Sequence, residues 1–249
     1  MAHSHGAQGL SSIDYMAYSS HLSDVNTGLK IGFSVFLIVL CIATRSIPVG
    51  IFSAIVCACL VVLIGKTKLH HYLSVLEVPV GFMLVGAIAI ALDFSGIHRE
   101  NILLALRVLL TAFGAVSAMF LLTLTTPVSE ITAALERMHL PHIIIELMNM
   151  IYRFIFVLSS VQNQMHTSAK ARLGYYGFRT GLRTFGSTIG NLLIVSLASA
   201  NAYYDAMTAR CYDGHLAFLT ETKPMRARHV AVCGVLAAAA LALWLLTRR

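Results

Sequence analysis

The sequence predicts an all-α integral membrane protein with about five transmembrane helices, and three observations support this class. Hydrophobic residues make up 57% of the 249 residues and charged residues only 12%, with a mean hydropathy of +0.77. A soluble globular domain carries about 25% charged residues, so the composition excludes that class. Five apolar segments approach or reach the roughly 20 residues that a spanning helix needs. A long polar stretch separates the fourth segment from the fifth and predicts long helices outside the membrane.

The predicted spans follow one another in a simple order. They cover Ile31–Ala43, Pro48–Gly65, Val80–Gly96, Ile102–Thr125 and Val230–Leu246. The first span is short, but it can extend through a snorkelling Lys30. The first four form two hairpins, and His70 and His71 are expected in the loop between them. This pattern divides the chain into a membrane region (1–126), a cytoplasmic or interfacial helical region (127–226) and a C-terminal membrane helix (227–249).

The lysine and arginine residues predict the orientation. With a cytoplasmic N-terminus, the basic residues of the 127–229 stretch lie inside, while the outside holds Arg45, Arg99 and the discordant terminal pair Arg248-Arg249. An excess of basic residues on the cytoplasmic side is usual for membrane proteins. We therefore expect a multi-pass protein of the bacterial inner membrane. The formal net charge is +7, but the basic residues cluster between apolar segments and not along a polar face. Nucleic acid is therefore not an expected partner.

Two charged residues lie inside predicted spans. Asp93 falls near the end of the third span and Arg107 near the start of the fourth. Charges at such positions mark functional sites by default. In antiparallel neighbours the two would lie at similar depth, where they form either a structural ion pair or part of an ion pathway.

The polar stretch predicts three helices. A short one opens at Ser129-Glu130 and ends before Pro141, and a longer one runs from His142 to Arg172. The residues Gly174-Tyr175-Tyr176-Gly177 end that helix, and a third helix continues to about Cys211. The third helix carries two small-residue pairs, which allow close approach of another helix. These pairs are Gly186 with Gly190 and Ser196 with Ala200.

An Ala-Arg pair occurs twice, each time where a long helix is predicted to end. The pairs are Ala171-Arg172 and Ala209-Arg210, and each is followed by aromatic residues and a glycine. About 34 helical residues separate the arginines, which corresponds to about 50 Å. They cannot share one small ligand, but they can each bind one copy of a partner through a carboxylate. The alternative is that both arginines only cap their helices.

With these motifs the chain resembles the transmembrane T component of energy-coupling factor (ECF) transporters, most closely the cobalt branch. The resemblance covers nearly the whole chain and includes the N-terminal run Ile13–Asn26 ending at Lys30. It implies that each motif arginine docks one of two ATPase subunits, so Ala171, Arg172, Ala209 and Arg210 form the docking sites. The usual family motif is Ala-Arg-Gly, whereas this chain has Leu173 and Cys211 at the third positions.

The resemblance also implies the remaining partners. The T component would link the ATPase pair to a substrate-binding membrane subunit, with a further small membrane subunit in some systems and lipid around all of them. ATP and magnesium would belong to the ATPase, so this chain is expected to bind no cofactor. We expect the face of the third helix that carries Gly186, Gly190, Ser196 and Ala200 to transmit the movement of the ATPases.

Other functions remain open at this point. Nickel or a vitamin could replace cobalt as the substrate. Neither an enzyme nor an ATP site is expected, because clustered catalytic groups and a phosphate loop are absent from the sequence. A conventional permease would need a polar path beyond Asp93 and Arg107. No metal site is predicted, since His3 and His5 lie near a terminus and His139 and His142 straddle Pro141.

Overall fold

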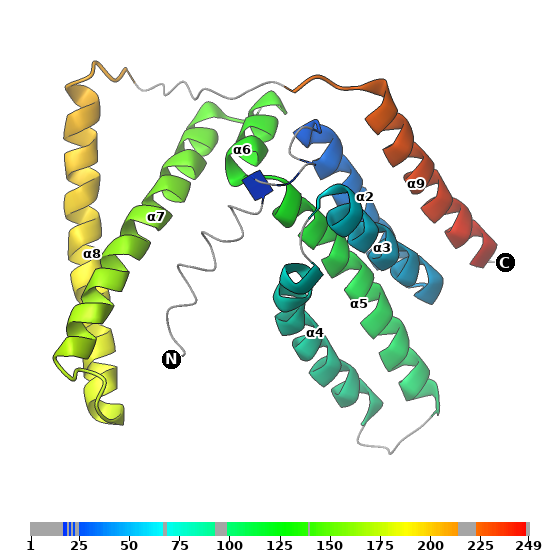
Figure 1. Cartoon of the computed structure of the whole chain (residues 1–249), viewed down its shortest axis with the longest axis horizontal. Helices are drawn as coiled ribbons and strands as arrows, with labels where there is room; N and C mark the ends of the chain where they lie inside the picture. Colours follow the sequence, from blue (N-terminus) through cyan, green and yellow to red (C-terminus); the bar gives the residue numbers. More distant parts are fainter. Residues whose placement is uncertain are drawn as a thin grey trace. The chain divides into compact units, whose positions relative to one another are not determined.

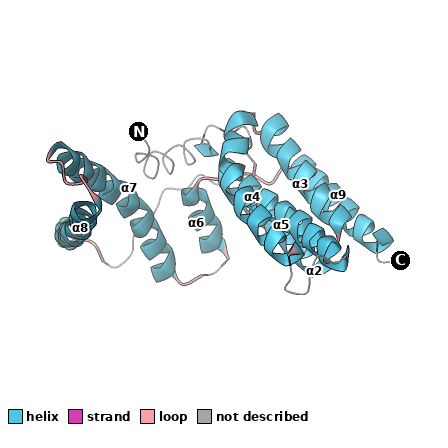
Figure 2. Cartoon of the chain, turned by 90° about the horizontal axis from the view of Figure 1, so that it is seen from below, coloured by secondary structure: helices cyan, strands magenta, loops and turns pink. Residues whose placement is uncertain are grey.

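The computed structural model describes residues 17, 18, 20, 22, 25–66, 69–92, 99–138, 140–213 and 223–247 (Figure 1). The secondary structure of these residues is helical, without strands, which confirms the predicted all-α class (Figure 2). Contacts divide the chain into two compact units. One contains the described residues of the ranges 13–131 and 221–249 and is called the bundle, and the other contains those of the range 132–220 and is called the hairpin unit.

Among the described residues, seven helices are long and apolar enough to cross a membrane. Five correspond to the predicted spans: α2 (Thr27–Thr44), α3 (Ile47–Cys59) continued by the π-helical turn η2 (Leu60–Ile64), α4 (Leu69–Ala91), α5 (Arg99–Thr125) and α9 (Ala227–Thr247). The other two, α7 (His142–Ala171) and α8 (Phe178–Thr208), have the lowest hydropathy of the seven. The short helix α6 (Val128–Arg137) follows α5.

Two details of the predicted spans are wrong. Helix α4 begins at Leu69, so His70 and His71 lie in its first turn and not in a loop. Pro79 lies inside this helix, where it removes one backbone donor but does not end the helix. Lys30 does not snorkel, because it is 7% exposed and its Nζ donates to the carbonyl oxygens of Leu22 and Thr125, at 3.0 Å and 2.9 Å.

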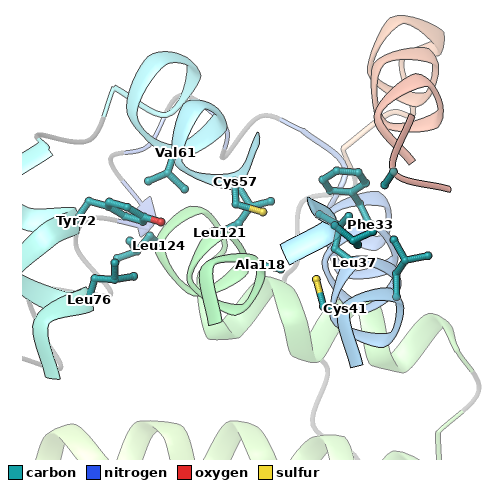
Figure 3. Packing of buried hydrophobic residues seen from close by; sticks show 13 residues of the cluster. Phe33, Leu37, Cys41, Cys57, Val61, Tyr72, Leu76, Ala118, Leu121 and Leu124 are labelled. Atoms are coloured by element: carbon teal, nitrogen blue, oxygen red, sulfur yellow. The ribbon is translucent and has the colours of Figure 1, made fainter. Parts of the chain in front are cut away.

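Helix α5 is the centre of the bundle. It contacts α2, α3, η2 and α4, while α9 packs on α2 and α3. Buried side chains of these helices form one apolar core, and Figure 3 shows Leu121 and Leu124 of α5 among residues from the surrounding helices. The core therefore fixes the membrane region around a single central helix.

Helices α3 and α5 cross with their backbones in contact. A Cβ atom added to Gly50 would lie 2.4 Å from the Leu110 carbonyl oxygen, and one added to Gly114 would lie 2.5 Å from the Gly50 carbonyl oxygen. Ser53 Oγ donates to the Gly114 carbonyl oxygen across the same crossing, at 3.2 Å. Only glycine fits at these two positions, as at the close crossings of membrane helices.

A polar cluster holds one end of the bundle. The Glu130 carboxylate accepts hydrogen bonds from Thr27 Oγ1, at 2.8 Å, and from Lys223 Nζ. The Asn26 amide donates to the Lys223 carbonyl oxygen at 2.8 Å, and its Oδ1 caps α2 by accepting from Gly28 N. These bonds join the starts of α2 and α6 to the segment before α9.

Helices α7 and α8 form an antiparallel hairpin (Figures 1 and 2). Phe154 packs edge-to-face on Tyr203, with ring centroids 5.5 Å apart, and the Arg153 guanidinium lies 5.1 Å from the same tyrosine ring. Only Ile145 and Glu146 of α7 are buried, and no residue of α8 is. The hairpin therefore leaves most of its apolar surface open.

Candidate docking site

The two Ala-Arg pairs end their helices with the same backbone turn. In the first, Leu173 N donates to the Lys170 carbonyl oxygen and Gly174 N to that of Ala169. In the second, Cys211 N donates to the Thr208 carbonyl oxygen and Tyr212 N to that of Met207. In each cap the second hydrogen bond joins an N–H group to the carbonyl oxygen five residues earlier, which is characteristic of a Schellman cap. The sequence repeat is therefore also a structural repeat.

The residue after each arginine has a left-handed backbone. The φ angle is 56° at Leu173 and 60° at Cys211. A residue with a side chain adopts this conformation at a cost of about 1–2 kcal/mol, and glycine adopts it freely. This geometry gives a physical reason for a glycine at the third position of an Ala-Arg-Gly motif. Leucine and cysteine adopt the same cap here, so the departure from glycine leaves the arginines in equivalent positions.

The first arginine lies beside a strongly exposed apolar surface. Leu173, Tyr176 and Phe178 are 71%, 82% and 87% exposed. The turn beneath them is held in place, because Thr184 Oγ1 donates to the Gly174 carbonyl oxygen at 2.7 Å. Large exposed apolar side chains next to a rigid turn are typical of a surface that binds a protein.

A groove of about 600 Å³ lies between α7 and α8 at this end of the hairpin. Arg172 and Arg183 both line it, together with polar side chains that include Ser168, Thr184 and Asn191. Of the described residues, no Asp or Glu lines the groove, and neither guanidinium forms an ion pair. Two unpaired arginines in one groove suit a carboxylate ligand, which accepts bidentate hydrogen bonds. The sequence reasoning did not single out Arg183.

The second arginine has different surroundings. Tyr212, two residues after Arg210, donates a hydrogen bond of 2.5 Å to Glu146 Oε1, which ties this end to the start of α7. The bond to Glu146 raises the pKa of Tyr212 to about 12, so the phenol stays protonated at neutral pH. His142 Nδ1 lies 3.8 Å from the other Glu146 oxygen. The exposed Asp213 follows directly in the chain.

The glycine pair of α8 has no neighbour within the described part of the chain, whereas Ser196 of the second small-residue pair is half-buried. A Cβ atom at Gly186 or Gly190 would meet open space. Ser196 donates to the Leu193 carbonyl oxygen of its own helix, and Ala200 is exposed. The half-buried face of α8 instead follows residues such as Thr184, Thr188 and Leu192. A tight contact at the glycine pair would therefore have to come from a partner.

The other predicted sites are only partly described. Asp93, His3, His5 and His139 lie outside the described residues, as does most of the Ile13–Asn26 run, so the structure does not test the Asp93–Arg107 pair. Within the described ranges, no group of three His, Cys, Asp or Glu side chains could hold a metal ion.

The sequence matches the CbiQ cobalt transport protein family over residues 19–219. The cobalt transport protein CbiQ of Salmonella typhimurium is 23% identical over 82% of this chain and 98% of its own length. The CbiQ of Rhodobacter capsulatus is 29% identical over 64% of this chain and 67% of its own length. A Methanocorpusculum labreanum protein with the name of a fused cobalt transport protein, CbiMQ, is 28% identical over 84% of this chain and 38% of its own length. The chain is a membrane protein that belongs to the CbiQ family of cobalt transport proteins.

Proposed function

We propose that this chain is the transmembrane coupling subunit of an ATP-driven ECF-type uptake transporter for cobalt ions. One observation carries the proposal: two arginines with the same helix-capping geometry lie at opposite ends of α8. The 31 residues of this helix span about 46 Å. A single small ligand cannot reach both arginines, whereas two copies of an ATPase subunit can each bind one.

The first docking end supplies the stronger attachment. An acidic side chain of one ATPase subunit enters the groove and accepts hydrogen bonds from Arg172 and Arg183. Leu173, Tyr176 and Phe178 lose their solvent exposure against the same partner. Burying apolar side chains of this size typically stabilises a complex more than one surface ion pair does.

The second docking end binds the other ATPase subunit through Arg210. The Tyr212–Glu146 hydrogen bond keeps the start of α7 and the end of α8 together. A push on Arg210 is therefore transmitted to both helices of the hairpin. The large exposed apolar residues of the first end have no counterpart among Cys211, Tyr212 and Asp213. We therefore expect weaker binding at this end.

The remaining machinery belongs to partners. ATP and magnesium bind the ATPase subunits, and a substrate-binding membrane subunit holds the cobalt ion. The open face of α8 around Gly186 and Gly190 contacts that membrane subunit and moves with the ATPases. The relative named as a fused cobalt transport protein, of which this chain spans 38%, supports a close association with a second cobalt transport component.

Charge reversal tests the two docking sites. The tagged chain is co-expressed with its ATPase, and the wild type is compared with Arg172→Glu, Arg210→Glu and the double variant. Each single change should weaken co-purification, Arg172→Glu more strongly, and the double change should abolish it. Arg137→Glu alters an exposed arginine of α6, outside both docking ends, and serves as the matched control. Undiminished binding by the double variant would reduce both motifs to helix caps.

A further inference from the structure

Two adjoining grooves at one end of the bundle share a pair of arginines. Arg45 and Arg107 line a groove of about 320 Å³ and also a second one of about 450 Å³. Arg45 lies in the turn between α2 and α3, and Arg107 lies on α5. Both side chains are exposed, and neither takes part in an ion pair with another described residue. Two cations therefore meet at one place without a counter-charge from the described chain.

The smaller groove has the lining of a headgroup site. Besides the arginines, it is lined by the backbone turn at Ser46 and by Trp244 and Thr247 of α9. Tryptophan is typical of the membrane–water interface, where its ring lies at the level of the lipid headgroups. Of the described residues, no acidic side chain lines either groove. The pair of guanidinium groups can bind one phosphate with several hydrogen bonds.

The larger groove has the lining of an acyl-chain site. It runs between α2 and α5 and is mostly apolar, with Ile42, Leu104, Val108, Ala112 and Ala115 in its wall. The two shared arginines join it to the headgroup groove. A molecule that fits both grooves has a negatively charged group at one end and a hydrocarbon chain at the other.

Helix lengths place the arginines within reach of the lipid. Helix α2 has 18 residues, or about 27 Å, slightly less than the roughly 30 Å of a bilayer core. Helix α5 has 27 residues, or about 40 Å, and its residues 102–104 near Arg107 are exposed and apolar. An arginine near such a surface is costly without an anion. Because α2 is shorter than the hydrocarbon core, the bilayer thins beside it and a lipid headgroup comes within reach of the arginines. The phosphate of that headgroup would supply the anion.

We propose that these grooves bind one anionic phospholipid, with its phosphate between Arg45 and Arg107 and an acyl chain between α2 and α5. The site stabilises the end of the bundle where α2, α3, α5 and α9 meet. It is independent of the ATPase docking ends and needs only that the chain lies in a bilayer.

The single tryptophan of the chain makes the site directly observable. The full-length protein in mixed micelles is titrated with brominated phosphatidylglycerol or brominated phosphatidylcholine, and quenching of Trp244 fluorescence is recorded. Near a membrane surface each arginine favours an anionic lipid by about fivefold in affinity, so the pair favours it by about 25-fold. Phosphatidylglycerol should therefore reach half-quenching at about one twenty-fifth of the mole fraction that phosphatidylcholine requires.

Variants assign the preference to the two arginines. In Arg45→Gln/Arg107→Gln the two lipids should quench equally, whereas the control Arg179→Gln, on the exposed surface of α8, should keep the wild-type preference. Equal quenching in the wild type would overturn the proposal and favour an acidic side chain at this place, such as the predicted ion-pair partner Asp93. An unchanged preference in the double variant would overturn it as well. The wild-type comparison is decisive even if the double variant fails to fold.

Discussion

The bundle and the α7–α8 hairpin use the same small residues for opposite purposes. In the bundle, Gly50 and Gly114 lie in backbone contact and close the crossing of α3 and α5. In the hairpin, Gly186 and Gly190 face open space, and no residue of α8 is buried. The glycine contact of the bundle is therefore made within the chain, whereas the glycine face of α8 is uncovered. The proposed function assigns that face to a partner subunit.

The largest predicted effect is the loss of stability when the α3–α5 crossing of the bundle is disrupted. Gly114→Leu should lower the free energy of unfolding by about 3 kcal/mol or more, because its side chain would overlap the Gly50 backbone. For a chain of this size that corresponds to a fall in Tm of roughly 6–12 °C. Thermal unfolding in detergent measures it, with Gly86→Leu on an open face of α4 as the control. Equal Tm values for the two variants would contradict the close crossing.

A smaller effect compares the two helix caps. Leu173→Gly and Cys211→Gly should each raise Tm by about 2–4 °C, since each removes about 1 kcal/mol of backbone strain. Leu173→Gly should nevertheless weaken ATPase binding, because an exposed apolar contact is lost, whereas Cys211→Gly should not. Leu173→Ala separates the two effects, since it keeps the strained backbone and removes the contact. A fall in Tm for both glycine variants would contradict the left-handed caps.

The smallest effect on stability is expected at the open glycine pair. Gly186→Leu should change the free energy of unfolding by less than about 0.5 kcal/mol, because its side chain enters open space. If this face transmits movement to the substrate-binding subunit, the same variant should uncouple ATP hydrolysis from cobalt uptake while ATPase binding persists. Uptake and hydrolysis measured together in vesicles provide the test. Normal uptake would exclude this face as the transmitting surface.

Most of the helices could be predicted because apolar length is a strong signal. The start of α4 could not, because Pro79 and the polar residues His70 and His71 interrupt the apolar run although the helix continues through them. Lys30 was expected at the lipid surface, and only the fold reveals that carbonyl oxygens from separate segments surround its ammonium group. Such partners cannot be inferred from the residues adjacent in sequence.

The two helix ends of the candidate docking site and their arginines were predicted from the sequence. The other side chains that surround these ends were not predicted. The repeated Ala-Arg pair gave the helix ends, but Arg183 and the Tyr212–Glu146 bond come from neighbouring helices. The Gly50–Gly114 crossing had a readable signal, since each glycine stands four residues before a buried alanine, Ala54 or Ala118. The same spacing occurs at Gly186 and Gly190, so spacing alone does not reveal whether the neighbour lies in this chain.

Counting the bound ATPase subunits tests the central claim most directly. Intact-mass measurement of the nucleotide-free complex should find two ATPase copies per chain for the wild type. One copy should remain for Arg172→Glu or Arg210→Glu, and none for the double variant. Nucleotide is omitted so that contact between the ATPases does not retain the undocked copy. Two copies on every variant would contradict the account, because the arginines would then not be docking residues.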